Sequence, residues 1–168
     1  LLRYIYSCGH RRIAYIHGHP SSVTGSRLSS FYKTAEELGL KVPDEYVLEA
    51  GYRDTDGAAA ATQQLLALPC PPTCILYPDD FACLGGMNML REKGLRIPEG
   101  ISIAGYDGLR IGRHMDPKLT TLKQDTQKLG GYAAEKLISL IEHPKTSVPE
   151  ILVVEGEVYE GRSVGNIG

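Results

Sequence analysis

The chain has 168 residues, 42% of them hydrophobic, a length and composition that suit one ordinary domain with a real core. Its 18 basic and 20 acidic residues leave a formal net charge of −2, and no run of Lys or Arg is long enough to follow a phosphate backbone. The composition therefore argues against a nucleic-acid-binding surface on these residues.

The cysteines lack the regular spacing of a disulfide framework: Cys8, Cys70, Cys74 and Cys83 suit a reducing compartment as buried apolar residues. No His follows Cys70 and Cys74 at zinc-finger spacing, so we expect no metal there. No apolar stretch approaches membrane-spanning length, and the first residues lack the pattern of a secretory signal. These features predict a cytoplasmic location and no membrane contact.

Short β-branched runs alternate with longer helical segments, which predicts a parallel α/β sheet with crossover helices. Strands are predicted at residues 12–17, 46–48, 74–77 and 101–106. Helices are predicted at residues 25–38, from Asp54 or Thr55 to Pro69, and at 81–93. Strand–helix units in this succession indicate a doubly wound parallel sheet with flanking helices.

The regular alternation ends after Asp107, where a long connection with one short extended piece leads to an amphipathic helix at 125–142. The apolar residues expected to face inward are Leu129, Tyr132, Ala133, Leu137, Ile138 and Ile141. Two further strands are predicted at 151–158 and 162–164.

Ligands of open α/β sheets bind beyond the carboxyl ends of the strands, so the residues after each predicted strand are candidates for a site. These strand exits offer Arg27, Tyr52, Asp79, Asp80 and Asp107 toward one rim. A guanidinium and carboxylates form charge-assisted hydrogen bonds with hydroxyls, and an aromatic ring stacks on an apolar face. The set suits a polyhydroxylated ligand.

Structural explanations compete with this interpretation. Asp80 precedes a helix, and N-capping explains it better than ligand contact, which leaves Asp79 to face the cleft. Tyr52 could equally be a core aromatic, and Asp107 could be an ordinary turn residue. Arg27 at the start of a helix is badly placed for the helix dipole, which favours a role in the cleft.

Evidence for catalysis is weak. Asp79 and Asp107 could form a carboxylate pair, but no His or Lys accompanies them in a plausible shared geometry. His17 and His19 could bind a metal, but no third ligand is evident. The sequence lacks a phosphate-binding GxxxxGK, a GxGxxG after the first strand and a GxSxG elbow. We therefore expect no enzyme, no cofactor and no metal.

Successive motifs extend over nearly the whole chain, from Gly9 to Val164. They are GHRRIAYIHG, TGSRLSSFYKTAEELGL, CILYPDDFACLGGMNMLREKGLRIPEGISIAGYDG, PKLTTLKQD and EGRSV. In this order they resemble the signatures of the LacI/GalR family of transcriptional regulators. The resemblance implies a type I periplasmic-binding-protein-like fold, in which two α/β subdomains close on a small molecule, usually a sugar or nucleoside-like ligand.

The resemblance also implies ligand-binding residues. Arg27 matches the arginine that holds ligand hydroxyls, and Tyr52 matches the aromatic residue that stacks on the ligand. Asp79, Asp107 and Gln124 match further residues of the cleft.

A dimer interface is implied as well. It would include Leu84, Met87 and Leu90 on the helix at 81–93, together with Ile111 and Met115.

The resemblance divides the chain into parts. Residues 1–122 are the main part of the C-terminal effector-binding subdomain, residues 123–143 are the crossover helix that belongs to the N-terminal subdomain in intact relatives, and residues 144–168 are returning strands. Operator DNA would be bound only through an N-terminal helix-turn-helix absent from this chain. Because the apolar side of the crossover helix would lack its usual partner, we expect a homodimer, formed through the 81–93 helix or by exchange of the crossover helix.

These expectations describe the ligand-sensing and dimerising module of a LacI/GalR-like regulator. Binding of a small molecule, most simply a sugar, would shift the population between open and closed forms and alter operator affinity. The alternative is a sugar-binding solute receptor of a transporter with the same fold.

Overall fold

A six-stranded sheet in the order β2-β1-β3-β4-β5-β6 forms the centre of the computed structural model, which describes residues 1–146, 148 and 150–168. The strands are β1 (Ile13–His17), β2 (Val47–Glu49), β3 (Cys74–Leu76), β4 (Ser102–Asp107), β5 (Thr120–Lys123) and β6 (Glu157–Tyr159). Strands β1 to β5 are parallel, and β6 pairs antiparallel with β5. This confirms the predicted α/β class.

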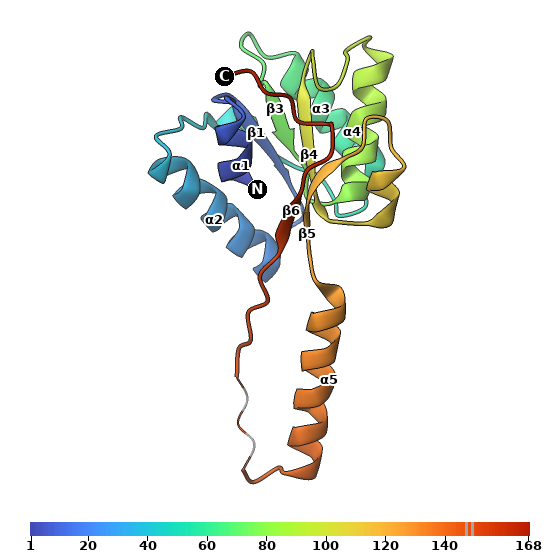
Figure 1. Ribbon diagram of the computed structural model, residues 1–168. Helices are drawn as coiled ribbons and strands as arrows, with labels where there is room; N and C mark the ends of the chain where they lie inside the picture. The colour runs from blue at the N-terminus through green and yellow to red at the C-terminus, as the bar shows by residue number, and fades with distance from the viewer. Residues whose placement is uncertain (147, 149) are drawn as a thin grey trace.

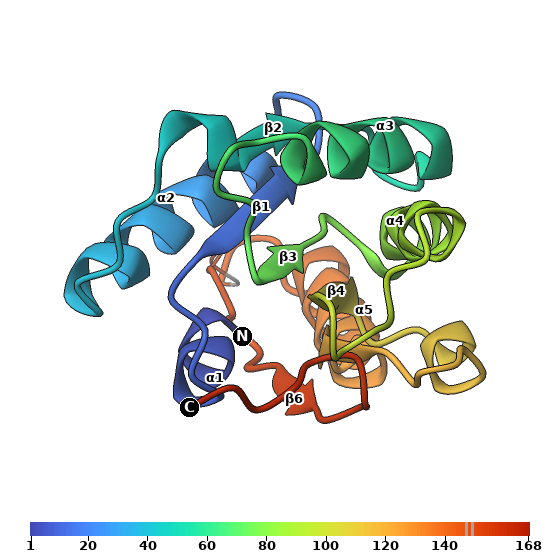
Figure 2. The ribbon, with the colours of Figure 1, turned by 90° about the horizontal axis from the view of Figure 1, so that it is seen from above.

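Helices cover both faces of the sheet (Figure 2). The helices of the structure are α1 (Leu2–Ser7), α2 (Ser22–Glu37), α3 (Thr55–Leu66), α4 (Asp80–Glu92) and α5 (Thr126–Glu142), with short 3-10 helices η1 (Asp44–Tyr46) and η2 (Arg110–Arg113). Helices α1 and α2 pack on one face, and α3 and α4 pack on the other, as a doubly wound sheet requires. Within the described part of the chain, none of these helices combines the length and apolarity that a bilayer crossing needs.

The alternation of side chains along β1 explains why both faces are buried. Ile13 and Tyr15 join the core beneath α1 and α2, whereas Ala14 and Ile16 join the core beneath α3 and α4. A strand buried on both faces needs a continuous apolar run rather than alternating polar residues. The run IAYI therefore specifies an interior strand.

The first four predicted strands are confirmed to within one residue at each end. Helix α3 begins after Asp54, which is one of the two predicted caps. The Asp54 side chain accepts a hydrogen bond from Gly57 N. Helix α2 begins three residues earlier than predicted because Ser21 caps it, accepting from Thr24 N. Helix α1 was not predicted. The side of this helix that carries Leu2 and Ile5 is buried.

The prediction of two late strands is largely wrong. Of residues 151–158 and 162–164, only those within Glu157–Tyr159 form a strand. The chain before β6 runs beside α5, away from the sheet (Figure 1), so its β-branched residues have no neighbouring strand to pair with. Ser163 instead bridges two strands from the sheet edge, accepting from Thr120 N at 2.8 Å and donating to Ile103 O at 2.7 Å.

Helix α5 projects from the body of the molecule (Figure 1). All of its described residues are at least partly exposed, including Ile138 at 53% and Ile141 at 69%. Leu152 and Val154 line a cavity together with Leu129 and Leu137 of α5, but among the described residues most of the apolar side of this helix is exposed. The assignment of residues 123–143 to a second subdomain, and of 144–168 to returning strands, stays a prediction; residues 147 and 149 lie outside the described residues.

Two adjacent glycines, Gly85 and Gly86, allow α4 to approach its neighbours closely. A Cβ at Gly85 would overlap the carbonyl oxygen of Thr55, and one at Gly86 would overlap the phenol of Tyr77. The Tyr77 hydroxyl is itself fixed, because it lies 2.7 Å from the Thr62 hydroxyl inside the core. Tyr77 cannot move aside without breaking this bond.

We expect Gly86→Ala to lower the free energy of unfolding by about 1–3 kcal/mol, the usual cost of overpacking a close-packed core. Gly130→Ala is the matched control, because that glycine lies in α5 with nothing within 4 Å of an added Cβ. The control should be neutral or stabilising by up to roughly 1 kcal/mol. Urea unfolding monitored by circular dichroism measures both, and equal effects would contradict the close approach.

Candidate functional site

Arg27 on α2 reaches across the carboxyl edge of the sheet. Its guanidinium lies 3.6 Å from the centroid of the Tyr106 ring and 5.8 Å from that of Tyr52. One nitrogen donates a hydrogen bond to the carbonyl oxygen of Pro78 at 2.9 Å, and another lies 4.0 Å from Asp107 Oδ1. The guanidinium thus links the exits of β3 and β4, and stacking on Tyr106 orients it.

Asp107 occupies the last position of β4 in an unusual backbone conformation. Its φ is +109°, and that of the following Gly108 is +72°. Non-glycine residues with positive φ cost on the order of 1–3 kcal/mol and are enriched at functional sites. Asp107 Oδ1 accepts a hydrogen bond from Gln124 Nε2 at 2.6 Å. Burial raises the pKa of Asp107, while the bond from Gln124 and the charge of Arg27 oppose that rise.

Tyr52 is 38% exposed, so it is not a core aromatic residue. Its ring lies against Gly18, where a Cβ would overlap it, and its hydroxyl is 2.9 Å from the hydroxyl of Thr24. These contacts hold the ring against the loop that follows β1 and the first turn of α2, and part of the ring stays exposed.

The two adjacent acids divide their roles differently from the prediction. Asp79, not Asp80, is the N-cap of α4: its Oδ1 accepts from Ala82 N at 2.8 Å. Its Oδ2 accepts from Arg53 N at 2.7 Å, and the residue is only 3% exposed. The backbone explains the correction, because Asp79 is extended whereas Asp80 is already the first residue of the helix.

Asp80 is fully buried and bonded to two other segments. Its Oδ1 accepts from the Thr121 hydroxyl at 2.6 Å, and its Oδ2 accepts from Leu109 N at 2.6 Å. Burial raises the pKa of Asp80 from 3.8 to about 6, against the opposing effect of these two bonds. The sequence contained no clear signal for this role, because an acid in the first turn of a helix is favoured by the helix dipole whether or not it bonds to other segments.

The structure therefore brings Arg27, Asp107 and Gln124 into one cluster and places Tyr52 beside it. Tyr106 is a member of this cluster that the sequence interpretation missed. Asp79 lies behind the rim with both carboxylate oxygens occupied by backbone N–H groups.

The predicted dimer surface needs correction. Met87 and Leu90 are fully buried, because this side of α4 packs on the sheet and on α3. Met115 packs against the same core, although it is partly exposed. Leu84 and Met115, which are partly exposed, and Ile111, which is exposed, remain available as surface residues from that set.

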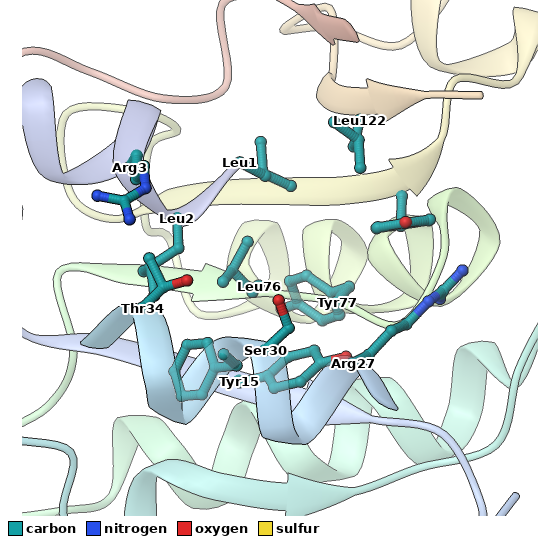
Figure 3. Close-up of a pocket in the computed structure, with 12 residues that line it drawn as sticks. Leu1, Leu2, Arg3, Tyr15, Arg27, Ser30, Thr34, Leu76, Tyr77 and Leu122 are labelled. Carbon is teal, nitrogen blue, oxygen red and sulfur yellow. The ribbon is translucent and has the colours of Figure 1, made fainter. Parts of the chain in front are cut away.

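A cavity of about 270 Å³ lies beside this cluster, between the sheet and helices α1 and α2. Figure 3 shows Leu1, Leu2, Leu76 and Leu122 around it, with Arg27 at one end. The cavity wall is largely apolar, so the stem of Arg27 separates an apolar space from the polar rim. Among the described residues, no group of three or more His, Cys, Asp and Glu is arranged to hold a metal ion.

The sequence of the chain is similar to those of known proteins. Residues 2–164 match the family model described as periplasmic binding protein-like domain. The chain is 34% identical over 165 residues to the HTH-type transcriptional repressor PurR of Escherichia coli, covering 98% of this chain and 48% of the repressor. It thus spans about half the length of the curated relatives that it matches.

Solved structures agree. The chain resembles the transcriptional regulator LacI from Bacillus cereus subsp. cytotoxis, with a TM-score of 0.90, 25% identity and coverage of 99% of this chain and 58% of that one. It also resembles the regulator CelR in complex with cellobiose, with a TM-score of 0.87, 28% identity and coverage of 96% and 49%.

We expect Asp80→Asn to change the pH dependence of folding. Because the folded-state pKa of Asp80 is raised from 3.8 to about 6, the folded chain binds more protons than the unfolded chain between these values. The contribution of Asp80 to stability is therefore fully present below the unfolded-state pKa and is lost as the pH rises to about 6.

Chemical denaturation over a range of pH measures this effect. The difference in free energy of unfolding between wild type and Asp80→Asn should fall through that window and stay constant above it. Asp44→Asn, which alters an exposed carboxylate in η1, is the control. Parallel curves for wild type and Asp80→Asn would contradict the raised pKa.

Proposed function

The chain belongs to the family of periplasmic binding protein-like domains, and from this premise we propose that it is the C-terminal part of the effector-binding domain of a LacI-family transcriptional regulator. The relatives that support this class are a transcriptional repressor and LacI-family regulators. The intact protein would bind a small molecule at the rim of the sheet and change its affinity for operator DNA in response.

The observation that carries the ligand proposal is the pairing of Arg27 with Asp107, 4.0 Å apart at the partly exposed edge of the sheet. This spacing puts hydrogen-bond donors next to an acceptor, and two neighbouring hydroxyls of one ligand can satisfy both. The exposed ring of Tyr52 offers a surface on which a sugar ring or a base can stack. The solved complex of a similar regulator with cellobiose favours a sugar.

Gln124 and Asp79 contribute to the proposed ligand site in different ways. Gln124 donates to Asp107 and so holds the carboxylate in place beside the ligand. Asp79 acts through the loop after β2, because it accepts from the backbone of Arg53, the neighbour of Tyr52. In this proposal Asp79 shapes the site without exposing its own carboxylate.

We propose that this rim is one wall of a ligand-binding cleft, as the resemblance to a fold of two closing α/β subdomains implies. An opposing wall would supply the contacts that favour a closed form, and ligand binding would shift the population toward that form. We propose that the chain binds its ligand without converting it and works in the cytoplasm, where a regulator meets DNA; the repressor relative supports both points.

A solute receptor of a transporter with the same fold is the alternative function. The sequence encoded upstream discriminates between them: a helix-turn-helix supports the regulator, and a signal peptide supports the receptor.

We expect Asp107→Asn to weaken effector binding by about 10- to 150-fold, the loss of a hydrogen bond to a charged group. The measurement is a thermal-shift screen of sugars and nucleosides on the full-length protein, followed by calorimetry on those that bind. Asp44→Asn is the matched control, because this exposed carboxylate precedes β2 at the opposite edge of the sheet. Unchanged affinity in Asp107→Asn would remove Asp107 from the site.

We also propose that this chain forms a homodimer in which the apolar side of α5 is covered by a second copy. Sedimentation should show a dimer for the 168-residue chain and a monomer for the double variant Ile138→Glu with Ile141→Glu, because buried charges oppose association. Ile111→Glu is the comparison, since Ile111 lies on the η2 surface. A monomeric wild type, or a dimer lost only in Ile111→Glu, would contradict the role of α5.

A further inference from the structure

The backbone that follows Asp107 is held by two buried side chains. Leu109 N donates to Asp80 Oδ2 at 2.6 Å, and Gly108 N donates to the Thr121 hydroxyl oxygen at 3.2 Å. The Thr121 hydroxyl in turn donates to Asp80 Oδ1 at 2.6 Å. These three bonds, which we call the Asp80–Thr121 anchor, tie the turn after β4 to the start of α4 and to β5.

The turn needs such an anchor. Asp107 has a φ of +109°, and a non-glycine residue keeps a conformation of this kind only when its surroundings impose it. Gly108 also has a positive φ, and a Cβ there would overlap Lys123, so the turn lies directly against β5. The anchor supplies fixed partners for the two amides that come immediately after the strained residue.

The anchor also requires a carboxylate. Asp80 accepts two hydrogen bonds from different directions, one on each oxygen. An asparagine has one amide oxygen, so at least one of these two hydrogen bonds would have to be lost or reversed. A buried carboxylate close to Asp79 and Asp107 is unfavourable for folding, since burial and both neighbours raise its pKa. A residue chosen only for stability would not be expected here.

We propose that Asp80 is a positioning residue of the ligand site, which acts through Thr121 and the turn at Gly108 and Leu109 to direct the Asp107 carboxylate toward Arg27 and Gln124. Asp80 is itself fully buried and does not touch the ligand. The proposal rests on the proposed function in taking Asp107 as a ligand contact. The arrangement of the turn can be tested without any ligand.

The test is hydrogen exchange at single amides of the 168-residue chain, measured by NMR in Thr121→Val, Thr121→Ser and Thr120→Val. Thr120 is the matched control, because it is a buried threonine on the same strand whose hydroxyl accepts from Gly161 N instead. Valine removes the hydroxyl at nearly constant shape, and serine keeps it.

Thr121→Val should speed exchange at Gly108, Leu109 and Gln124 by about tenfold relative to Thr120→Val, since the anchor loses two of its three hydrogen bonds. Tyr77 N, which donates to Ala104 O, is the reference amide and should respond equally in both variants. Thr121→Ser should restore slow exchange. Equal exchange at the turn in Thr121→Val and Thr120→Val would overturn the proposal, because the hydroxyl would then have only a general structural role.

Crystal structures of Thr121→Val and Asp80→Asn provide the second measurement. We expect Asp107 to leave its positive φ and the separation of Arg27 and Asp107 to exceed the 4.0 Å of the wild type. An unchanged Asp107 in both variants would also overturn the proposal. Neither readout involves a ligand, so failure of the anchor and failure of the proposed function can be told apart.

Discussion

The geometry of the site depends on the backbone of Asp107, which carries the last side chain of β4 at a positive φ. In an ordinary extended conformation, this carboxylate would not keep its present relation to Arg27 and Gln124. The close packing of α4 on the sheet brings Asp80 under the turn, and β5 brings Thr121. The core of the fold and the ligand site are therefore parts of one packing arrangement.

The adjacent acids at the start of α4 show how one helix terminus can serve two loops. Asp79 caps the helix with one oxygen and holds the loop at Arg53 with the other. Asp80 faces the other way and holds the turn at Leu109. Tyr52, which lies on the first of these loops, and Asp107, which directly precedes the second, are thus positioned from a single point at the end of β3.

Sequence patterns were sufficient for β1 to β4 and for helices α2 to α4. For β1, β3 and β4 the reason is that a buried apolar run leaves little ambiguity. The sequence also predicted that the residues after these strands lie near one another, since parallel strands end at the same edge of the sheet. It could not separate Asp79 from Asp80, because that choice depends on which residue enters the helix first. The burial of Met87 and the absence of pairing near residue 151 follow likewise from tertiary neighbours that are distant in the sequence.

The central claim is that the carboxyl edge of the sheet binds a small polar ligand. Its most direct test is an NMR titration of the isotopically labelled chain with cellobiose, ribose and adenosine, one at a time, with backbone amide shifts mapped onto the structure. We predict shifts at Tyr52, Asp107 and Gln124, and none at Gly39 or Lys41 at the opposite edge. Shifts confined to the apolar cavity beneath α1, or no response at the rim to any of the three compounds, would contradict the account.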